Sequence, residues 1–325
     1  MLNHFTPAKG LANPHLQTLL PRYLRRTPLF APRTQRLTTP DGDFIDLAWT
    51  TAPTADNAPL FVLFHGLEGC FRSPYANGSL HAASQQGWQG VMMHFRGCSG
   101  EPNRFATSYH SGHTKDARFL IQWLRRHYPH RTIMAVGISL GGNMLVNYLA
   151  QYGQNAGIDM AQVVSAPLNL SSCSARIQQG FSRVYQTYLL GSLKRNAAMK
   201  AKRHPHAFSL SDKEILNVSN LWQFDHQVTA PLNGFTGAED YYQQCSGLPK
   251  LAQIVQPLRL LHAKDDPFMD ENVIPDSQTL PSNVDYLLLE RGGHVGFITG
   301  SLQQPQFWLE HTIPAWFQQQ LQSRD

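Results

Sequence analysis

The stretch AVGISLGGNML, residues 135–145, joins an apolar run, a Gly-x-Ser-x-Gly pattern centred on Ser139 and a segment with helical spacing. This order predicts a buried strand that turns sharply into a helix, with glycines giving the backbone room at the turn. The serine hydroxyl would then project above the sheet, beside the positive end of the helix dipole. A serine among glycines is also compatible with an ordinary turn, so the rest of the chain must distinguish a nucleophile from a turn residue.

The sequence around this stretch predicts a parallel sheet. Short apolar runs, of the kind expected for strands buried on both faces, lie at 60–66, 90–95, 132–138 and 161–167. Segments with helical spacing separate them, including 112–128, where Thr114 is the expected N-cap. Alternation of strands and helices predicts right-handed crossovers in a mostly parallel sheet. Before these strands, an irregular N-terminal arm and a β-hairpin at 33–52, with an Asp-Gly turn, are expected.

The alternation stops between residues 170 and 256 and resumes at 258–264 and 284–290, before a closing helix expected at 303–322. We therefore predict one domain, residues 1–325, with a mainly helical cap inserted at 170–256. Aromatic residues of this cap are expected either to line an acyl pocket or to pack the cap onto the core: Trp222, Phe224, Phe235, Tyr241 and Tyr242.

Composition bounds the class of protein. A chain of 325 residues with 42 % hydrophobic residues can bury one large core. Its four widely spaced cysteines form no Cys-x-x-Cys pair, and neither a secretory signal nor a run of eighteen apolar residues is present, which predicts a soluble, cytoplasmic protein. The net charge of +5 comes with no nucleic-acid-binding motif, so we expect no nucleic-acid partner. Clustered arginines favour a solvated basic surface, and the alternative is peripheral contact with an anionic membrane or attraction of acidic substrates.

A serine hydroxyl needs a base, and the base needs an orienting carboxylate. His294, in ERGGHVGF, and the pair Asp265 and Asp266, in AKDDPF, each follow a predicted strand. The chain order Ser, Asp, His is that of an α/β-hydrolase. We favour Asp266 as the acid, because it lies three residues beyond Ala263 at the end of its strand. Asp265 is then a solvated or turn-capping carboxylate.

The loop FHGLEG, residues 64–69, supplies a possible oxyanion hole. A His-Gly motif after a strand offers the next backbone N–H, here that of Leu67, to pair with the N–H of Leu140 after the nucleophile. His65 is expected to hold this loop in place. Arg96, in HFRGCSG, could meet an anionic substrate, but a role in stabilising its loop is favoured.

Seven strings together resemble the α/β-hydrolases, and specifically their YheT-like (embryogenesis-associated) branch: NPHLQT, FHGLEG, HFRGCSG, GISLGGN, FDHQVTAPLNGF, DDPF and GGHVGF. The resemblance implies an α/β-hydrolase fold and a serine hydrolase with a triad of Ser139, Asp266 and His294. Eukaryotic members of this branch include membrane-associated lipid hydrolases.

These residues predict hydrolysis of a carboxylic ester, on a small molecule or a lipid, through an acyl-enzyme on Ser139. A thioester or an amide would use the same groups. The mechanism needs no cofactor, and no metal site is predicted. The alternative is a ligand-binding or sensor protein that keeps the hydrolase fold without catalysis, because fold alone does not imply activity. The sequence makes no prediction of oligomeric state.

Overall fold

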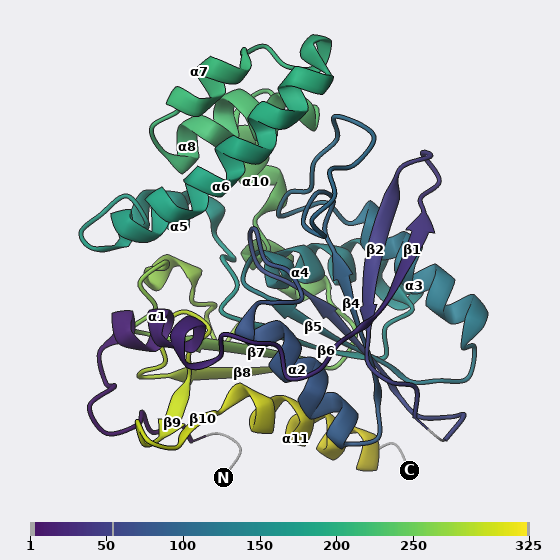
Figure 1. Cartoon of the computed structure of the whole chain (residues 1–325). Helices are drawn as coiled ribbons and strands as arrows, with labels where there is room; N and C mark the ends of the chain where they lie inside the picture. Colours follow the sequence, from purple (N-terminus) through teal and green to yellow (C-terminus); the bar gives the residue numbers. More distant parts are fainter. Residues whose placement is uncertain (1–3, 54, 324–325) are drawn as a thin grey trace.

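The protein, described as a computed structural model for residues 4–53 and 55–323, is built on one large sheet (Figure 1). Its strand order is β1-β2-β4-β3-β5-β6-β7-β8. The strands are β1 (Arg33–Thr38), β2 (Phe44–Trp49), β3 (Leu60–Phe64), β4 (Gln89–His94), β5 (Ile133–Ile138), β6 (Met160–Val164), β7 (Leu258–Ala263) and β8 (Val284–Leu289). Strands β3 to β8 pair in parallel, whereas β1 and β2 form the antiparallel hairpin at one edge. The predicted fold class, a mostly parallel sheet of an α/β protein, is confirmed.

Helices cover both faces of the sheet, and alternate residues of β3 show how. Leu60, Val62 and Phe64 pack with α3 (Lys115–His127) and α4 (Leu140–Tyr152). Phe61 and Leu63 point the other way, toward α2 (Pro74–Gln85) and α11 (Leu309–Gln322). This alternation follows from the two-residue period of a strand, and a strand covered twice must be apolar throughout.

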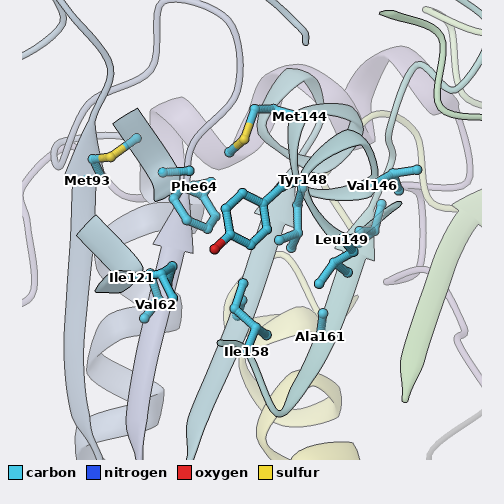
Figure 2. Close-up of a cluster of buried hydrophobic side chains, with 14 of the residues drawn as sticks. Val62, Phe64, Met93, Ile121, Met144, Val146, Tyr148, Leu149, Ile158 and Ala161 are labelled. Carbon is cyan, nitrogen blue, oxygen red and sulfur yellow. The ribbon is translucent and has the colours of Figure 1, made fainter. Parts of the chain in front are cut away.

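The core on the α3 and α4 side includes Tyr148, shown in Figure 2 between Phe64 and Ile158. Its hydroxyl donates to the carbonyl oxygen of Ala156 at 2.5 Å, so burial leaves this polar atom satisfied. Each fully buried apolar side chain of this size contributes about 1.5–3 kcal/mol through the area removed from water. This packing makes the sheet a rigid base for the loops at its carboxyl edge.

Between β6 and β7 the chain forms a set of helices that stands above the sheet in Figure 1. We call α5 to α10, residues 170–245, the cap. Its α-helices are α5 (Leu170–Arg176), α6 (Ser182–Arg203), α7 (Asp212–Asn217), α8 (Leu221–Phe224), α9 (Ala230–Leu232) and α10 (Ala238–Cys245), with a π-helical turn at Asp225–Thr229. Apolar side chains of α6, α7 and α8 pack together, among them Leu190, Ile215 and Phe224.

Three local features differ from expectation, two of them wholly and one in part. Residues 14–24 form a helix, α1 (Pro14–Leu24), whose N-cap side chain, Asn13, accepts hydrogen bonds from the backbone N–H groups of His15 and Leu16. Thr114 is the N-cap residue of α3, as expected, but its side chain makes no capping hydrogen bond, because its hydroxyl donates instead to Gln151 of α4 at 2.7 Å.

The third concerns the closing helix, which begins at Leu309 and not near 303. Residues before it form a short antiparallel pair, β9 (Ile298–Gly300) with β10 (Pro305–Phe307). Gly300, at a φ of +78°, turns the chain between the two strands. All four cysteines are free thiols. Within the residues that the structure describes, none of the helices has the length and apolar character needed to cross a bilayer.

Candidate active site

Ser139 lies at the sharp turn between β5 and α4. Its φ of +52° and ψ of −120° are strained for a residue with a side chain. The turn is held by a hydrogen bond from the Ser139 backbone N–H to the carbonyl oxygen of Val164, at 2.8 Å. At Gly141 a Cβ would collide with the carbonyl oxygens of Phe64 and His65, so glycine lets α4 start directly against the loop after β3. This packing fixes the position of the serine hydroxyl.

His294 and Asp266 complete a chain of hydrogen bonds that begins at Ser139. The Nε2 atom of His294 lies 3.0 Å from the Ser139 Oγ, and its Nδ1 lies 2.8 Å from the Asp266 Oδ2. A carboxylate only accepts, so its position assigns the proton to Nδ1 and leaves Nε2 to accept from the serine hydroxyl. Asp266 is 3 % exposed, and its Oδ1 accepts from the backbone N–H of Phe268 at 2.8 Å. The three residues come from the ends of β5, β7 and β8.

Asp265 faces away from this chain of hydrogen bonds. Its Oδ1 accepts from the backbone N–H of Gly293, at 2.9 Å. Asp265 therefore fastens the loop that carries His294, whereas Asp266 contacts the imidazole. The ring of Phe268 stacks on the His294 imidazole, with 4.0 Å between centroids and an interplanar angle of 8°. The imidazole is thus held by an acid at one nitrogen and by an aromatic ring on its face.

Helix α1 also supports the His294 loop, a role that the sequence reasoning missed. Thr18 Oγ1 accepts from the His294 backbone N–H at 2.9 Å, and Gln17 Oε1 accepts from the Ile298 N–H at 2.6 Å. Gln17 is fully buried, and its amide also donates to the Ile298 carbonyl oxygen at 3.0 Å. A Cβ at Gly296 would collide with the Gln17 carbonyl oxygen, so helix and loop are in close contact. The NPHLQT string was the available signal for this role.

The loop after β3 brings the Leu67 backbone close to Ser139. Two tyrosine hydroxyls fix this loop: Tyr75 accepts from the Gly66 N–H at 2.9 Å, and Tyr109 from the Glu68 N–H at 2.8 Å. The Leu67 N–H between them makes no hydrogen bond within residues 4–53 and 55–323. A Cβ on Gly66 would lie 3.2 Å from the Ser139 Cβ. An unpaired amide so near a nucleophile is what an oxyanion hole requires.

His65 supports the same loop from below. Its Nε2 accepts from the Phe95 backbone N–H at 3.0 Å, so the proton lies on Nδ1, which faces the Gly66 carbonyl oxygen at 2.7 Å. Complete burial lowers the pKa of His65 to about 3, so the ring is neutral. Both nitrogens are occupied by backbone groups, which agrees with the structural role expected for this histidine.

This geometry can be compared with known proteins. A family model with the description "alpha/beta hydrolase fold" matches residues 59–301. The chain belongs to the α/β-hydrolase family. Within that family the hydrolase belongs to the YheT-like branch: it is 51 % identical to the YheT protein of Escherichia coli (strain K12), which carries the name of an esterase, over 98 % of this chain and 94 % of YheT.

More distant proteins share part of the sequence or the fold. The human phospholipase ABHD3 is 26 % identical over 93 % of this hydrolase and 75 % of its own length. The structure of the Pyrococcus furiosus esterase Pf2001 has the same fold, with a TM-score of 0.54 at 14 % identity, covering 90 % of both chains. Several relatives of this chain carry the names of esterases or lipases.

A cavity of about 1060 Å³ lies above the hydrolase's Ser139, between the sheet edge, the cap and α1. Ser139, His294, Leu67 and Leu140 all line it. Of the five cap aromatics considered from the sequence, Phe224, Tyr241 and Tyr242 also line it, whereas Trp222 and Phe235 pack within the cap. Three of the five therefore line the cavity, and Phe235 also contacts His110, outside the cap, with 5.4 Å between ring centroids, as expected for packing of the cap onto the core.

One side of the cavity is polar and joins the cap to the loop after β3. Asn196 of α6 donates to Glu68 Oε2 at 2.6 Å, and Tyr109 donates to Glu68 Oε1 at 2.8 Å. One turn further along α6, Lys200 Nζ donates to the Thr107 carbonyl oxygen at 2.7 Å. Burial raises the pKa of Glu68 and lowers that of Lys200 to about 8. The cap is thus fastened directly beside Leu67, by residues that sequence reasoning did not single out.

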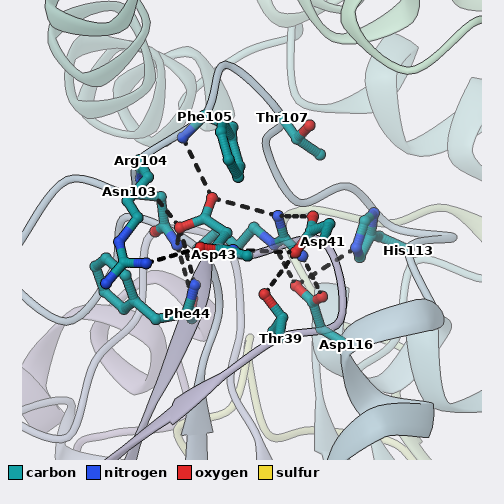
Figure 3. A network of polar contacts seen from close by, with 12 residues as sticks. Thr39, Asp41, Asp43, Phe44, Asn103, Arg104, Phe105, Thr107, His113 and Asp116 are labelled. Carbon is teal, nitrogen blue, oxygen red and sulfur yellow. Dashed lines mark hydrogen bonds and ion pairs between the residues drawn. The ribbon is translucent and has the colours of Figure 1, made fainter.

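Arg96 also lines the cavity, but all three of its guanidinium nitrogens donate hydrogen bonds to carboxylates. Its Nε and one terminal nitrogen each donate to Asp116 at 2.7 Å, and the other terminal nitrogen donates to Asp41 at 2.7 Å and Asp43 at 3.3 Å. Figure 3 shows these acids around the loop that follows β4. The network leaves Arg96 stabilising its loop, the role favoured from the sequence, and not free to bind an anion.

Proposed function

We propose that this chain is a serine hydrolase that cleaves carboxylic esters (EC 3.1.1) through an acyl-enzyme on Ser139. The observation that carries the proposal is the unbroken path from the Ser139 hydroxyl through His294 to Asp266, at 3.0 and 2.8 Å, on the wall of a large cavity. Both distances are in the range of a nucleophile bonded to its base and a base bonded to its orienting acid.

The chemistry follows from these positions. His294 Nε2 takes the hydroxyl proton as Ser139 Oγ bonds to the ester carbonyl carbon, and the oxyanion accepts hydrogen bonds from the N–H groups of Leu67 and Leu140. The carbon–oxygen bond to the alcohol then breaks, and the alcohol leaves with the proton from Nε2. Water gives a proton to Nε2 as its oxygen attacks the acyl carbon. The acid departs, and Ser139 regains its proton.

The size and lining of the cavity favour a lipid or a long acyl ester. At about 1060 Å³ the space is at the upper end of the range for small-molecule sites. Apolar side chains of the cap, such as Leu193, Phe224 and Val228, line it together with Ser139. The name of the phospholipase relative supports the same class of substrate.

Because lipid esters reside in bilayers, peripheral contact with an anionic membrane is part of this proposal. Four free thiols support a reducing compartment and a cytoplasmic location.

A hydrolysis screen over p-nitrophenyl esters of increasing chain length tests the proposal, with Ser139→Ala as the matched blank. Each additional methylene buried in the cavity should raise kcat/KM about fourfold until the apolar part is filled. The corresponding anilides report amide cleavage. If wild type and Ser139→Ala hydrolyse every ester at the same rate, the chain is a binding protein that keeps the hydrolase fold.

A further inference from the structure

Exposed apolar side chains are concentrated at one place on this protein. In the part of the chain that the structure describes, thirteen large apolar residues are exposed, and six of them form two short rows on neighbouring helices. Their exposed fractions lie between 36 and 61 %. We call these six residues the rim face: Leu16, Leu19 and Tyr23 of α1, and Phe181, Val184 and Tyr188 at the start of α6.

The two rows have the same spacing, three residues and then four, which places each row on one face of its helix. They also lie side by side. The ring of His15 is 4.4 Å from that of Phe181, and the guanidinium of Arg22 lies 4.9 Å from the centre of the Tyr188 ring. Early residues of α1 thus meet the start of α6, and later residues meet later ones, so the rows form one continuous surface.

This surface borders the cavity. Four of the six rim residues also line the cavity: Leu19, Tyr23, Val184 and Tyr188. A side chain that is half exposed and also lines a cavity marks where that cavity meets solvent. The rim face therefore continues directly into the apolar space that leads to Ser139.

The two chain segments that carry the rim face, residues 1–40 and 160–211, contain positively charged side chains and no carboxylate side chains. Residues 1–40 contain six Lys and Arg, and residues 160–211 contain seven, yet the chain's 22 Asp and Glu residues all lie outside these two segments. Exposed arginines stand beside the apolar rows, among them Arg22, Arg26 and Arg183. Cations beside exposed apolar side chains match a surface that is apolar inside and anionic outside, as a bilayer with anionic headgroups is.

We propose that the rim face docks on an anionic phospholipid surface, so that the cavity opens toward the bilayer from which the substrate enters. This inference rests on the proposed hydrolysis of lipid esters for its purpose, although the docking itself requires no catalysis. Apolar side chains at these positions would enter the interfacial region, and the arginines would remain with the headgroups.

Sedimentation with vesicles tests the docking in full-length Ser139→Ala protein, which cannot form an acyl-enzyme. Vesicles of equal parts phosphatidylcholine and phosphatidylglycerol should bind the protein, and vesicles of phosphatidylcholine alone should bind it far more weakly. The rim variant Leu16→Asp/Phe181→Asp should bind at least about tenfold more weakly. The control variant Val255→Asp/Leu302→Asp alters two side chains that are 51 and 56 % exposed elsewhere, and should bind like the parent.

The electrostatic part has its own test. Arg26→Gln/Arg183→Gln should lose most of the preference for phosphatidylglycerol, and added salt should weaken binding of the parent. Thermal melting followed by circular dichroism verifies that each variant is folded. Equal binding by the rim and control variants, or no binding to anionic vesicles at all, would overturn the proposal.

Two further outcomes separate the possibilities. A dimer that the rim variant abolishes, without any vesicle binding, would assign the face to a second copy of this chain and overturn lipid docking. Vesicle binding by a wild-type protein that hydrolyses no ester would uphold the docking while the proposed function fails. Vesicle binding therefore tests the docking, and ester hydrolysis tests the proposed function independently.

Discussion

Replacing Asp266 by asparagine should reverse the proton arrangement of the His294 imidazole. In the wild type, Asp266 Oδ1 accepts from the Phe268 N–H, and Oδ2 accepts from His294 Nδ1. An asparagine keeps its oxygen on the Phe268 N–H and so turns its NH₂ toward Nδ1. Since an NH₂ only donates, Nδ1 must become the acceptor, and the ring proton moves to Nε2.

With its proton on Nε2, the imidazole can no longer accept the proton of Ser139. Loss of the useful tautomer with intact geometry lowers kcat by about 10⁴, or about 5.4 kcal/mol of transition-state stabilisation. Burial should change little, because the two side chains have nearly the same volume. Steady-state hydrolysis of p-nitrophenyl butyrate by the purified variant measures the loss.

Asp265→Asn is the matched control, one residue away. Its oxygen can still accept from the Gly293 N–H, so kcat should fall less than about tenfold. Thermal melts should show both variants folded. The assignment of the acid is refuted if Asp266→Asn retains more than a tenth of wild-type kcat, or if Asp265→Asn loses as much as Asp266→Asn.

Three other variants test the surroundings of the site. Tyr109→Phe removes the hydroxyl that holds the Glu68 N–H and carboxylate, so kcat should fall about tenfold while KM barely changes; an unchanged kcat would deny this tyrosine a positioning role. Burial raises the pKa of Asp225 from 3.8 to about 6, because burial disfavours the charged carboxylate. The protonated carboxyl therefore makes its full contribution to the free energy of unfolding below about pH 4, and this contribution is lost as the pH rises through 6. Asp225→Asn should therefore be about 3 kcal/mol more stable than wild type to urea at pH 7 and nearly equal at pH 4, and a less stable variant at pH 7 would contradict this. Arg96→Met leaves buried Asp116 and Asp43 without their cation and should cost about 3–5 kcal/mol of unfolding free energy, part of which Asp116→Asn should restore; a loss under 1 kcal/mol would exclude the network as a major support.

The central strands were predictable because they are covered on both faces. A strand such as β3, with every residue buried, must be apolar without interruption, and this pattern is visible in one short stretch of sequence. Helix α1 was missed although Asn13 and Pro14 are a capping residue and a first-turn proline, because its short apolar stretch was read as an arm. The β9–β10 pair was missed because three-residue strands leave almost no periodic signal.

The three proposed catalytic residues could be predicted from the sequence, whereas the residues that support them could not. Ser139, Asp266 and His294 each follow a strand of a parallel sheet, and the carboxyl ends of such strands meet at one edge, so their meeting could be inferred. The supports could not be inferred. Gln17 contacts Ile298, which is 281 positions away, and Asn196 contacts Glu68 across 128 positions. Such contacts depend on how α1 and the cap pack on the finished fold, which local sequence patterns do not encode.

Covalent labelling tests the central claim most directly, which is that Ser139 is an activated nucleophile. Folded wild-type protein treated with a fluorophosphonate should gain one adduct per chain, and peptide mass spectrometry should locate it on Ser139. Ser139→Ala should remain unlabelled, and Asp265→Asn should label nearly as fast as wild type. An adduct on another residue, or no adduct on a protein whose thermal melt shows it to be folded, would contradict the account.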